Sequence, residues 1–284
     1  MVFHLLRSRQ PERHLCEGTG LNARTERWRQ AGLIAAGLGG FLLLWEFLVR
    51  SLAIKPYILP APSAIPAEMA KRWPTVVSGT LYTGEAMLVG FAVAVVIGVA
   101  LAVVVAFSRR LEALVYPVVL FLQIVPKIAV APLFLIWIGY GRTPKVLLVF
   151  LLSFFPVLLN SIQAFKSVDP EVMDLARSTG ASRWRIFRMV QLPHALPMIF
   201  TGIKVAAALS ATAAVVAEFV ASDRGLGYQL IEHSNNMNTS MTFGIILVLC
   251  AMGLLLYGAV EIIERLVIPW HVSRRVADPG GTTI

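Results

Sequence analysis

The chain has 284 residues, of which 57% are hydrophobic and 14% are charged, and its mean hydropathy is +0.73. About a quarter of the residues of an ordinary globular protein are charged, so this composition argues against a soluble enzyme, a disordered chain and a DNA-binding domain. It indicates a membrane protein. The formal net charge of +9 requires no nucleic-acid partner, and we expect none, because Lys and Arg of membrane proteins gather in cytoplasmic loops.

Six apolar stretches are long enough to cross a bilayer, whose hydrocarbon core takes about 20 helical residues. Five are continuous and lie at 31–49, 87–107, 146–165, 195–220 and 242–263. The sixth, at 112–139, is interrupted by Pro117, Pro126 and Pro132. Prolines inside a bilayer leave carbonyls that other protein or a water-filled cavity must satisfy. The sequence therefore predicts an all-α membrane protein with six transmembrane helices, the third of them broken.

The distribution of Lys and Arg predicts that both termini are cytoplasmic. With this orientation the cytoplasmic side holds 16 Lys and Arg residues and the external side holds 7, counted outside the spans, and positive loops remain inside. The expected parts are a cytoplasmic tail at 1–30, a first transmembrane helix at 31–49, an external loop with an interfacial helix at 50–84, a core of five spans at 80–264 and a cytoplasmic tail at 265–284.

The longest polar segment between spans is the loop at 166–194. Asp169 followed by Pro170 is typical of a helix N-cap and first turn, and Gly180 is typical of the residue after a helix end. A helix is therefore expected over 170–179.

A second short helix is expected over 183–190, capped by Ser182 and ended by Leu192 and Pro193. The predicted loop is thus a helix–turn–helix at the cytoplasmic face of the membrane. Because prolines remove backbone donors, we expect the joint at Pro193 and Pro197 to be non-helical or kinked and to act as a hinge, although these prolines are also compatible with an ordinary helix start.

Each predicted loop helix has one side with apolar residues at helical spacing. These residues are Val172, Leu175, Ala176 and Thr179 on the first helix, and Trp184, Phe187 and Gln191 on the second. The surface either packs under the membrane helices or fits a groove of a soluble partner. Arg183, Arg185 and Arg188 either bind anionic lipid or an acidic partner, or form a solvated face.

The spacing of this loop resembles the "EAA" coupling loop of permease subunits of ATP-binding cassette importers. The residues that carry the resemblance are Asp174, Leu175, Ala176, Gly180, Ala181, Leu192 and Pro193. Asp174 stands in place of the usual Glu and Leu175 in place of the first Ala. The resemblance implies that these residues contact an ATPase.

Three further segments resemble the nitrate/sulfonate/taurine-type branch of these permeases. They are LPAPSAI at 59–65, PKIAVAPLFLIWIGYG at 126–141 and AEFVASDRGLGYQL at 217–230. The resemblance implies a multi-pass subunit of the cell inner membrane with the type I importer permease fold. It also implies import of a small anion such as nitrate, a sulfonate or taurine.

The implied partners are an ATP-binding cassette ATPase subunit, an external or periplasmic solute-binding protein, a second copy of the chain and membrane lipid. No phosphate-binding G-x-x-x-x-G-K-[ST] motif and no paired metal-ligand spacing occurs in the sequence, so we expect no catalytic residues, no cofactor and no metal, with ATP hydrolysis on another subunit. The alternative is a secondary transporter or channel that acts without an ATPase. An intramembrane enzyme would need a catalytic constellation that the sequence lacks.

Polar residues inside the spans are candidates for the lining of a translocation path, because a charge in hydrocarbon is costly unless it is paired or hydrated. They are Gln123, Lys127, Asn160, Ser210, Thr212 and Glu218. As structural alternatives, Lys127 caps carbonyls freed by Pro126, and Glu218 bonds the RGLG turn at 224–227. Lys204 is expected to reach inward water. We expect Glu46, Glu85 and Glu261 at the ends of their spans.

Overall fold

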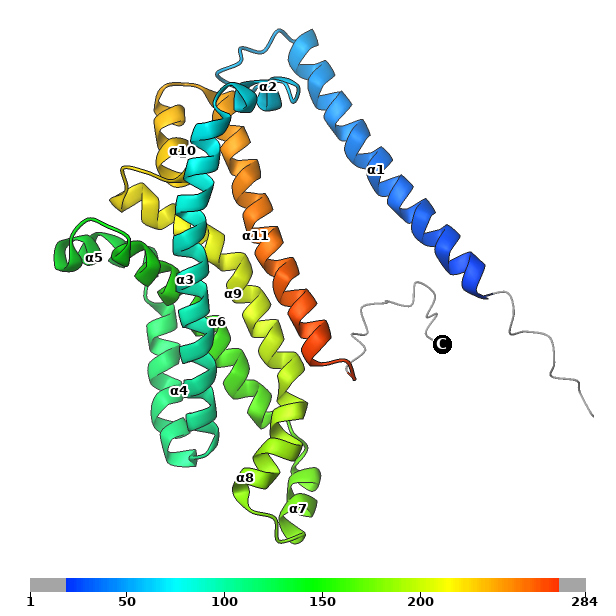
Figure 1. Ribbon diagram of the computed structural model, residues 1–284, viewed down its shortest axis with the longest axis vertical. Coiled ribbons are helices and arrows are strands. Elements are labelled where there is room, and N and C mark those ends of the chain that lie inside the picture. The colour runs from blue at the N-terminus through cyan, green and yellow to red at the C-terminus, as the bar shows by residue number, and fades with distance from the viewer. Residues whose placement is uncertain (1–18, 271–284) are drawn as a thin grey trace, which may run out of the picture. The chain divides into compact units, whose positions relative to one another are not determined.

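The computed structural model describes residues 19–270, and this part of the chain consists of helices and connecting turns without a strand. The chain divides into two compact units, Met1–Ala64 and Ile65–Ile284. Figure 1 shows the helices of both units. The predicted tail at 265–284 and most of the predicted tail at 1–30 lie outside the described residues.

The N-terminal unit contains one long helix, α1 at Thr19–Ser51, which includes the predicted span at 31–49. Its apolar side chains are exposed, as in Leu43 with 72% of its surface accessible. Near its end, the carboxylate of Glu46 accepts hydrogen bonds from Arg50 Nε at 2.6 Å and from the Ser63 amide at 3.1 Å. Glu46 therefore holds the segment that follows the helix.

The second unit, called the core here, consists of short and long helices in sequence (Figure 1). They are α2 (Ala64–Lys71), α3 (Trp73–Ala106), α4 (Arg109–Ile124), the 3₁₀ turn η1 (Lys127–Val130), α5 (Ala131–Ile138), α6 (Thr143–Lys166), α7 (Pro170–Ser178), α8 (Arg183–Ile186), the π-helical turn η2 (Phe187–Gln191), α9 (Leu192–Ala221), α10 (Leu226–Asn235) and α11 (Thr239–Val267). The short helix α2 occupies the place of the predicted interfacial helix.

Helix α6 packs along both α3 and α9 and forms the centre of the core. Glycines allow this close approach: a Cβ atom at Gly90 of α3 would lie 2.7 Å from Val149 Cβ of α6, and one at Gly202 of α9 would lie 2.6 Å from Asn160 Cβ. Small residues at helix interfaces let backbones approach and gain dispersion contacts where lipid supplies no hydrophobic drive. Helix α11 packs on α9 and α10.

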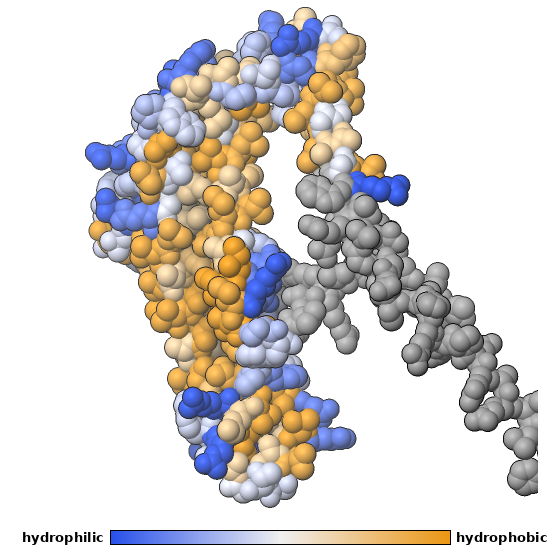
Figure 2. Space-filling model, turned by 45° about the vertical axis from the view of Figure 1, so that its right-hand side comes forward, coloured by the Kyte–Doolittle hydropathy of each residue, from blue (hydrophilic) through white to orange (hydrophobic). Residues whose placement is uncertain are grey.

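Within the described residues, four helical segments are long and apolar enough to cross a membrane, and a bent pair makes a fifth. The four are Trp73–Ala106, Thr143–Lys166, Arg183–Val220 and Thr239–Val267. Apolar side chains cover the middle of the face of the core seen in Figure 2, and hydrophilic side chains gather at its two ends. The passage of α1 through the membrane, and with it the count of six, stays a prediction.

The bent pair confirms the predicted break in the third span, but one proline accounts for it. Arg110–Ile124 and Lys127–Ile138 meet at 81°, with Pro126 between them. Pro117 lies inside the continuous helix α4, and Pro132 lies in the first turn of α5. A proline in a first turn removes only a donor that has no helical partner, so the prediction that Pro132 interrupts the span was wrong.

Helix α3 begins at Trp73, well before the predicted span start at 87. The hydroxyls in this early part donate to their own helix, for example Thr80 Oγ1 to Val76 O at 2.8 Å. Glu85 is therefore inside a helix and not at a span end, as expected from the sequence. Its carboxylate accepts from Arg142 Nη1 at 2.8 Å, and both side chains remain partly exposed.

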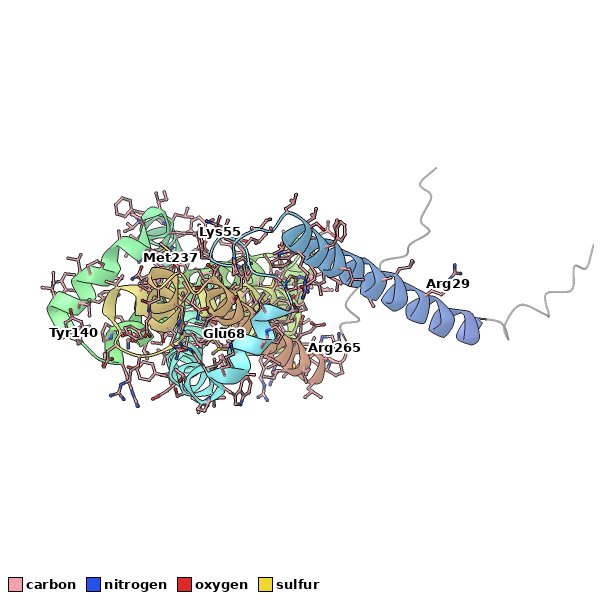
Figure 3. The ribbon with its side chains drawn as sticks, turned by 90° about the horizontal axis from the view of Figure 1, so that it is seen from above. Arg29, Lys55, Glu68, Tyr140, Met237 and Arg265 are labelled. Atoms are coloured by element: carbon pink, nitrogen blue, oxygen red, sulfur yellow. The ribbon has the colours of Figure 1, made fainter. Side chains whose placement is uncertain are left out.

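The end of the core that carries α2 and α10 is seen from above in Figure 3. Glu68 of α2 and Met237 of the α10–α11 turn lie at this end. The neighbouring Asn238 Nδ2 donates to Glu68 Oε1 at 3.3 Å. Helices α7 and α8 lie at the opposite end of the core (Figure 1).

Candidate functional site: the coupling loop and the polar groups of the core

Helix α7, the first helix of the loop, has the local signals that were predicted for it. Asp169 Oδ1 accepts from the Glu171 amide at 2.9 Å, and Pro170 occupies the first turn. The helix ends at Ser178, one residue before the predicted end at 179. Gly180 has a φ of +70°, which glycine adopts at no steric cost.

The apolar side of α7 is exposed to solvent in the core. Leu175 is 69% exposed and Val172 is 46% exposed, and α7 has no buried residue. The alternative in which this surface packs under the membrane helices is therefore not what the structure shows for α7. An exposed apolar stripe on a short helix is the form that a helix-in-groove contact requires.

Helix α8, by contrast, is anchored to the membrane helices by aromatic rings. Phe187 is 3% exposed, and its ring centroid lies 4.8 Å from that of Phe107 and 5.5 Å from that of Phe165. Trp184 stacks on Phe107 and Phe187 but keeps 60% of its surface exposed. Ser182 Oγ accepts from the Arg185 amide, as the predicted cap. The packing interpretation is thus correct for the second helix.

The prediction that Leu192 and Pro193 end the second loop helix was wrong. Helix continues from Arg183 through the π-helical turn Phe187–Gln191 into α9. The Leu192 amide donates to Phe187 O, five residues back. The wide turn rearranges the carbonyl partners just before Pro193, which has no N–H to donate. The chain is also helical through Pro197, so the expected non-helical joint is replaced by a π-turn.

Two path candidates, Gln123 and Lys127, meet at the break in the third span. Lys127 Nζ donates to Gln123 O at 3.1 Å and lies 4.5 Å from the centroid of the Phe155 ring. The ammonium therefore caps a carbonyl at the end of α4 and gains a cation–π contact. This is the structural alternative stated for Lys127.

Glu218 is buried, with 1% of its surface exposed, and its carboxylate is bonded on both oxygens. Oε1 accepts from Thr83 Oγ1 at 2.8 Å, and Oε2 accepts from the Gly227 amide at 2.6 Å. Thr83 Oγ1 in turn accepts from the Leu226 amide at 2.9 Å. Glu218 thus ties the start of α10 to α3 and α9, which is the bond to the RGLG turn stated as its structural alternative.

Lys145 is the buried charge that sequence reasoning missed. Its residue is 1% exposed, and Nζ donates to Tyr82 OH at 2.9 Å and to Ser222 Oγ at 2.7 Å. It lies within electrostatic range of Glu218. No sequence signal marked it, because a lysine just before an apolar run reads as an ordinary loop residue.

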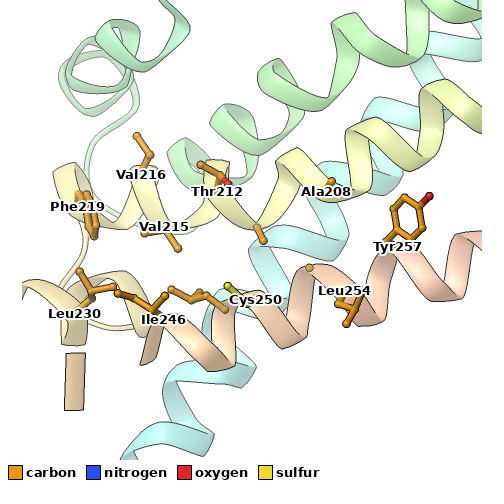
Figure 4. A pocket seen from close by; sticks show the side chains of 13 residues that line it. Ala208, Thr212, Val215, Val216, Phe219, Leu230, Ile246, Cys250, Leu254 and Tyr257 are labelled. Atoms are coloured by element: carbon orange, nitrogen blue, oxygen red, sulfur yellow. The ribbon is translucent and has the colours of Figure 1, made fainter. Parts of the chain in front are cut away.

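The remaining path candidates bond their own helices. Asn160 Nδ2 donates to Pro156 O at 2.7 Å, and Ser210 Oγ donates to Ala207 O at 2.7 Å. Thr212 lines a cavity of about 660 Å³ between α9, α10 and α11 (Figure 4). The other lining groups are apolar except for the side chains of Cys250 and Tyr257. The structure therefore does not bring the six candidates into one cluster.

Lys204 does not reach water, as was expected, but forms a buried ion pair. Its Nζ lies 2.5 Å from Glu264 Oε2, and the two residues are 4% and 8% exposed. The pair joins α9 to the last turns of α11. Glu264 received no role from the sequence because it lies just beyond the predicted end of the last span, where a carboxylate normally meets water. Nearby Glu261 pairs with Arg265 at 2.6 Å.

A family model described as the binding-protein-dependent transport system inner membrane component matches residues 94–269. The match includes the coupling loop and more than half of the chain. The chain belongs to this family. It is therefore a multi-pass permease component of an ATP-binding cassette importer of the inner membrane and not an enzyme, and ATP hydrolysis belongs to a separate subunit.

This permease is similar to transport proteins of several bacteria. It is 36% identical to the riboflavin transport system permease protein of Chloroflexus aurantiacus, over 82% of this chain and 87% of that protein. It is 30% identical to the formylaminopyrimidine transport permease protein of Halalkalibacterium halodurans, over 81% and 92%. It is 29% identical to the taurine transport system permease protein of Escherichia coli, over 88% and 96%.

Two solved structures share the fold of the permease. An inward-facing structure of the MetNI methionine ABC transporter has a TM-score of 0.56 at 20% identity and covers 69% of this chain and 98% of its own. The crystal structure of an amino acid ABC transporter with histidines has a TM-score of 0.56 at 19% identity, covering 72% and 98%. At these identities the likeness concerns the fold alone, which agrees with the predicted type I importer fold.

Proposed function

We propose that two copies of this permease form a translocation path for a small anion such as nitrate, a sulfonate or taurine. An ATPase subunit docks on the loop at 166–194 from the cytoplasm, and an external solute-binding protein delivers the cargo. The taurine permease of Escherichia coli among the relatives supports this substrate class. The alternative of a carrier without an ATPase has no support in the family match.

The observation that carries the proposal is the contrast between the two loop helices. Helix α7 presents Leu175 at 69% exposure, with Val172 beside it, whereas α8 is fixed by the buried Phe187 and continues into α9. An ATPase groove that receives α7 therefore has a continuous helical path to the membrane interior. Movement of the ATPase dimer would rotate α9 as a rigid body.

The π-turn at Phe187–Gln191 is the place where this motion would concentrate. A π-turn has a wider and less regular hydrogen-bond pattern than the α-helix on either side, and such turns occur frequently at functional sites. In this proposal it takes over the role of the hinge that the sequence placed at Pro193 and Pro197. Thr212, on the α9 face that lines the α9–α11 cavity, is then the path candidate that α9 movement displaces most directly.

The docking assignment is tested with Gly180→Leu and Ala176→Arg in the assembled importer. We expect both variants to insert normally and to lose ATPase binding, because a side chain at a φ of +70° strains the turn and an arginine enlarges the contact face. Gly139→Leu is the matched control, since Gly139 also has a positive φ of 84° and open space around it, at the other end of the core.

Cargo-dependent ATPase activity at the normal level in the Gly180→Leu complex would contradict docking. A second measurement separates the importer from a carrier: liposomes with the permease alone should transport nothing until the ATPase is added. Uptake by the permease alone would overturn the ATP-driven mechanism.

The substrate class is tested on the external binding protein that co-purifies with the complex. Its affinity should be measured for taurine, an alkanesulfonate and nitrate, and also for riboflavin and formylaminopyrimidine, which relatives carry. We expect an anion to bind most tightly. Tighter binding of a flavin or pyrimidine would contradict the anion assignment and leave the importer mechanism intact.

A further inference from the structure

A cavity of about 970 Å³ lies between the α3–α4 turn and the coupling loop. Three arginines line it, Arg110 of α4, Arg177 of α7 and Arg183 of α8, and no carboxylate is among its lining residues. We call it the arginine cavity. It brings together cationic groups from three elements that are separate in the chain.

The positive charge of the arginine cavity is largely uncompensated among residues 19–270. Arg110 and Arg183 form no ion pair there, and Arg177 pairs with Asp174 at 3.1 Å through two well-exposed side chains. The other nearby carboxylate, Glu112, pairs with Lys166. Because exposed pairs contribute little, the guanidinium groups remain available to an anion, and guanidinium binds phosphate oxygens in a bidentate way.

The position of the arginine cavity corresponds to the edge of the membrane. Helix α3 ends at Ala106, and the next residue, Phe107, stacks on Trp184 with ring centroids 6.0 Å apart. Aromatic rings with one exposed side, such as Trp184 at 60% exposure, are enriched at the level of lipid headgroups. The guanidinium groups beside them therefore lie where headgroup phosphates lie.

An apolar strip leads away from the arginine cavity along α4. Leu111, Leu114, Val118 and Phe121 are 40%, 66%, 50% and 68% exposed. Their spacing of three and four residues places them on one side of the helix, starting next to Arg110. A soluble anion or an acidic protein loop would use the arginines but has no need of this strip, whereas a phospholipid uses both.

We propose that the arginine cavity binds the headgroup of an anionic phospholipid of the cytoplasmic leaflet, with an acyl chain along the α4 strip. The lipid phosphate bridges α4 to both helices of the coupling loop. This site rests on the cytoplasmic position of the loop in the proposed function but not on ATPase docking. Basic pockets beside membrane helices on the cytoplasmic side are known forms of lipid sites.

The test uses the purified full-length permease and native mass spectrometry with added phosphatidylglycerol or phosphatidylcholine. The variant Arg110→Gln/Arg183→Gln should bind phosphatidylglycerol roughly tenfold or more weakly, with phosphatidylcholine binding unchanged. The matched control Arg185→Gln/Arg188→Gln removes two charges from the same segment outside the cavity and should bind like the unmodified protein. Equal losses in both variants would overturn the site.

Two further arms identify the ligand. Leu114→Gln should weaken phosphatidylglycerol binding, and inorganic phosphate at millimolar concentration should not displace the lipid. Displacement by phosphate together with an unaffected Leu114→Gln variant would mean that the site takes a soluble anion. If Arg110→Gln/Arg183→Gln instead loses ATPase binding with lipid binding intact, the cavity faces the ATPase and the lipid proposal is wrong.

Discussion

Glu218 shows why a carboxylate can lie in the apolar interior of this protein. Each of its oxygens accepts a hydrogen bond, from Thr83 and from Gly227, and Lys145 lies within electrostatic range. A buried charge is tolerated when it is paired and its acceptors are satisfied. The glycines of the RGLG turn make this possible, because a Cβ atom at Gly225 would lie 2.2 Å from Glu218 Oε1.

Gly227→Ala should destabilise the permease. A Cβ atom there would lie 2.8 Å from both Glu218 Cβ and Val215 O, so a backbone or a bonded carboxylate must move. We expect a loss of about 1–3 kcal/mol, seen as a lower midpoint of thermal unfolding in detergent. Gly258→Ala, in a helix with nothing within 4 Å of the new Cβ, is the matched control. Equal midpoints for the two variants would show that the contact at Gly227 is loose.

His233 of α10 predicts a pH dependence of stability at the external end. Burial, and secondarily the Arg72 guanidinium, holds the pKa of His233 below its ordinary value, against smaller opposite effects of Glu232 and Glu68. Between the lowered pKa and about 6.5 the unfolded chain binds a proton that the folded chain does not, so stability falls as the pH is lowered through this window.

The measurement is the unfolding midpoint between pH 7.5 and pH 5. We expect the midpoint to fall toward acid in the unmodified protein and to fall less in His233→Gln. Glu68, whose pKa is lowered first by its hydrogen bond to Lys71, acts only at more acid pH. Parallel pH profiles for the two proteins would exclude His233 as the source.

At the scale of elements, α9 is held at both ends by polar contacts and along its length by α6. Its outer end carries Glu218, and the Lys204–Glu264 pair fixes its inner half to α11. Its start is the π-turn that joins it to the coupling loop. Movement of α9 relative to α11 would therefore have to strain or exchange a buried ion pair, which gives the two helices a defined register.

Removing one partner of this ion pair should cost more than removing both. Lys204→Met leaves Glu264 buried and unpaired, with an expected loss of about 3–5 kcal/mol. Lys204→Met/Glu264→Leu should recover most of that loss, because apolar residues of similar volume replace the pair. Unfolding midpoints of the single and double variants measure the coupling. Additive losses would indicate that the two charges do not interact.

At the scale of the whole core, the two polar ends differ in charge and carry different functions. The end with α7 and α8 carries the loop arginines, and the other end carries α2, α10 and the turn at Tyr140. The count of Lys and Arg assigns the first end to the cytoplasm. ATPase docking and the lipid site both depend on this orientation.

Cysteine labelling tests the orientation. Cys16 and Cys250 are first replaced by Ser, and Asp174→Cys and Tyr140→Cys are then made at positions that are well exposed. An impermeant maleimide should label Tyr140→Cys in intact cells, and Asp174→Cys only in inside-out vesicles. The reverse pattern would place the coupling loop outside and remove the basis of the proposed function.

The sequence alone was sufficient for the helical class, the span positions and the caps of the coupling loop. Apolar runs are visible because a bilayer requires them, and Asp169, Gly180 and Ser182 act within a few residues of their own position. The family resemblance rests on the same local spacing, and the family match agrees with it.

Tertiary structure decided which polar groups are satisfied by neighbours far away in the chain. Lys145, Glu218, Lys204 and Glu264 have partners on other elements, so their burial has no local signal, and the sequence left two of them without a role. The arginine cavity likewise exists only because three separate elements converge. Local hydrogen bonds and apolar length are encoded residue by residue, whereas the pairing of buried charges depends on helix packing across the whole core.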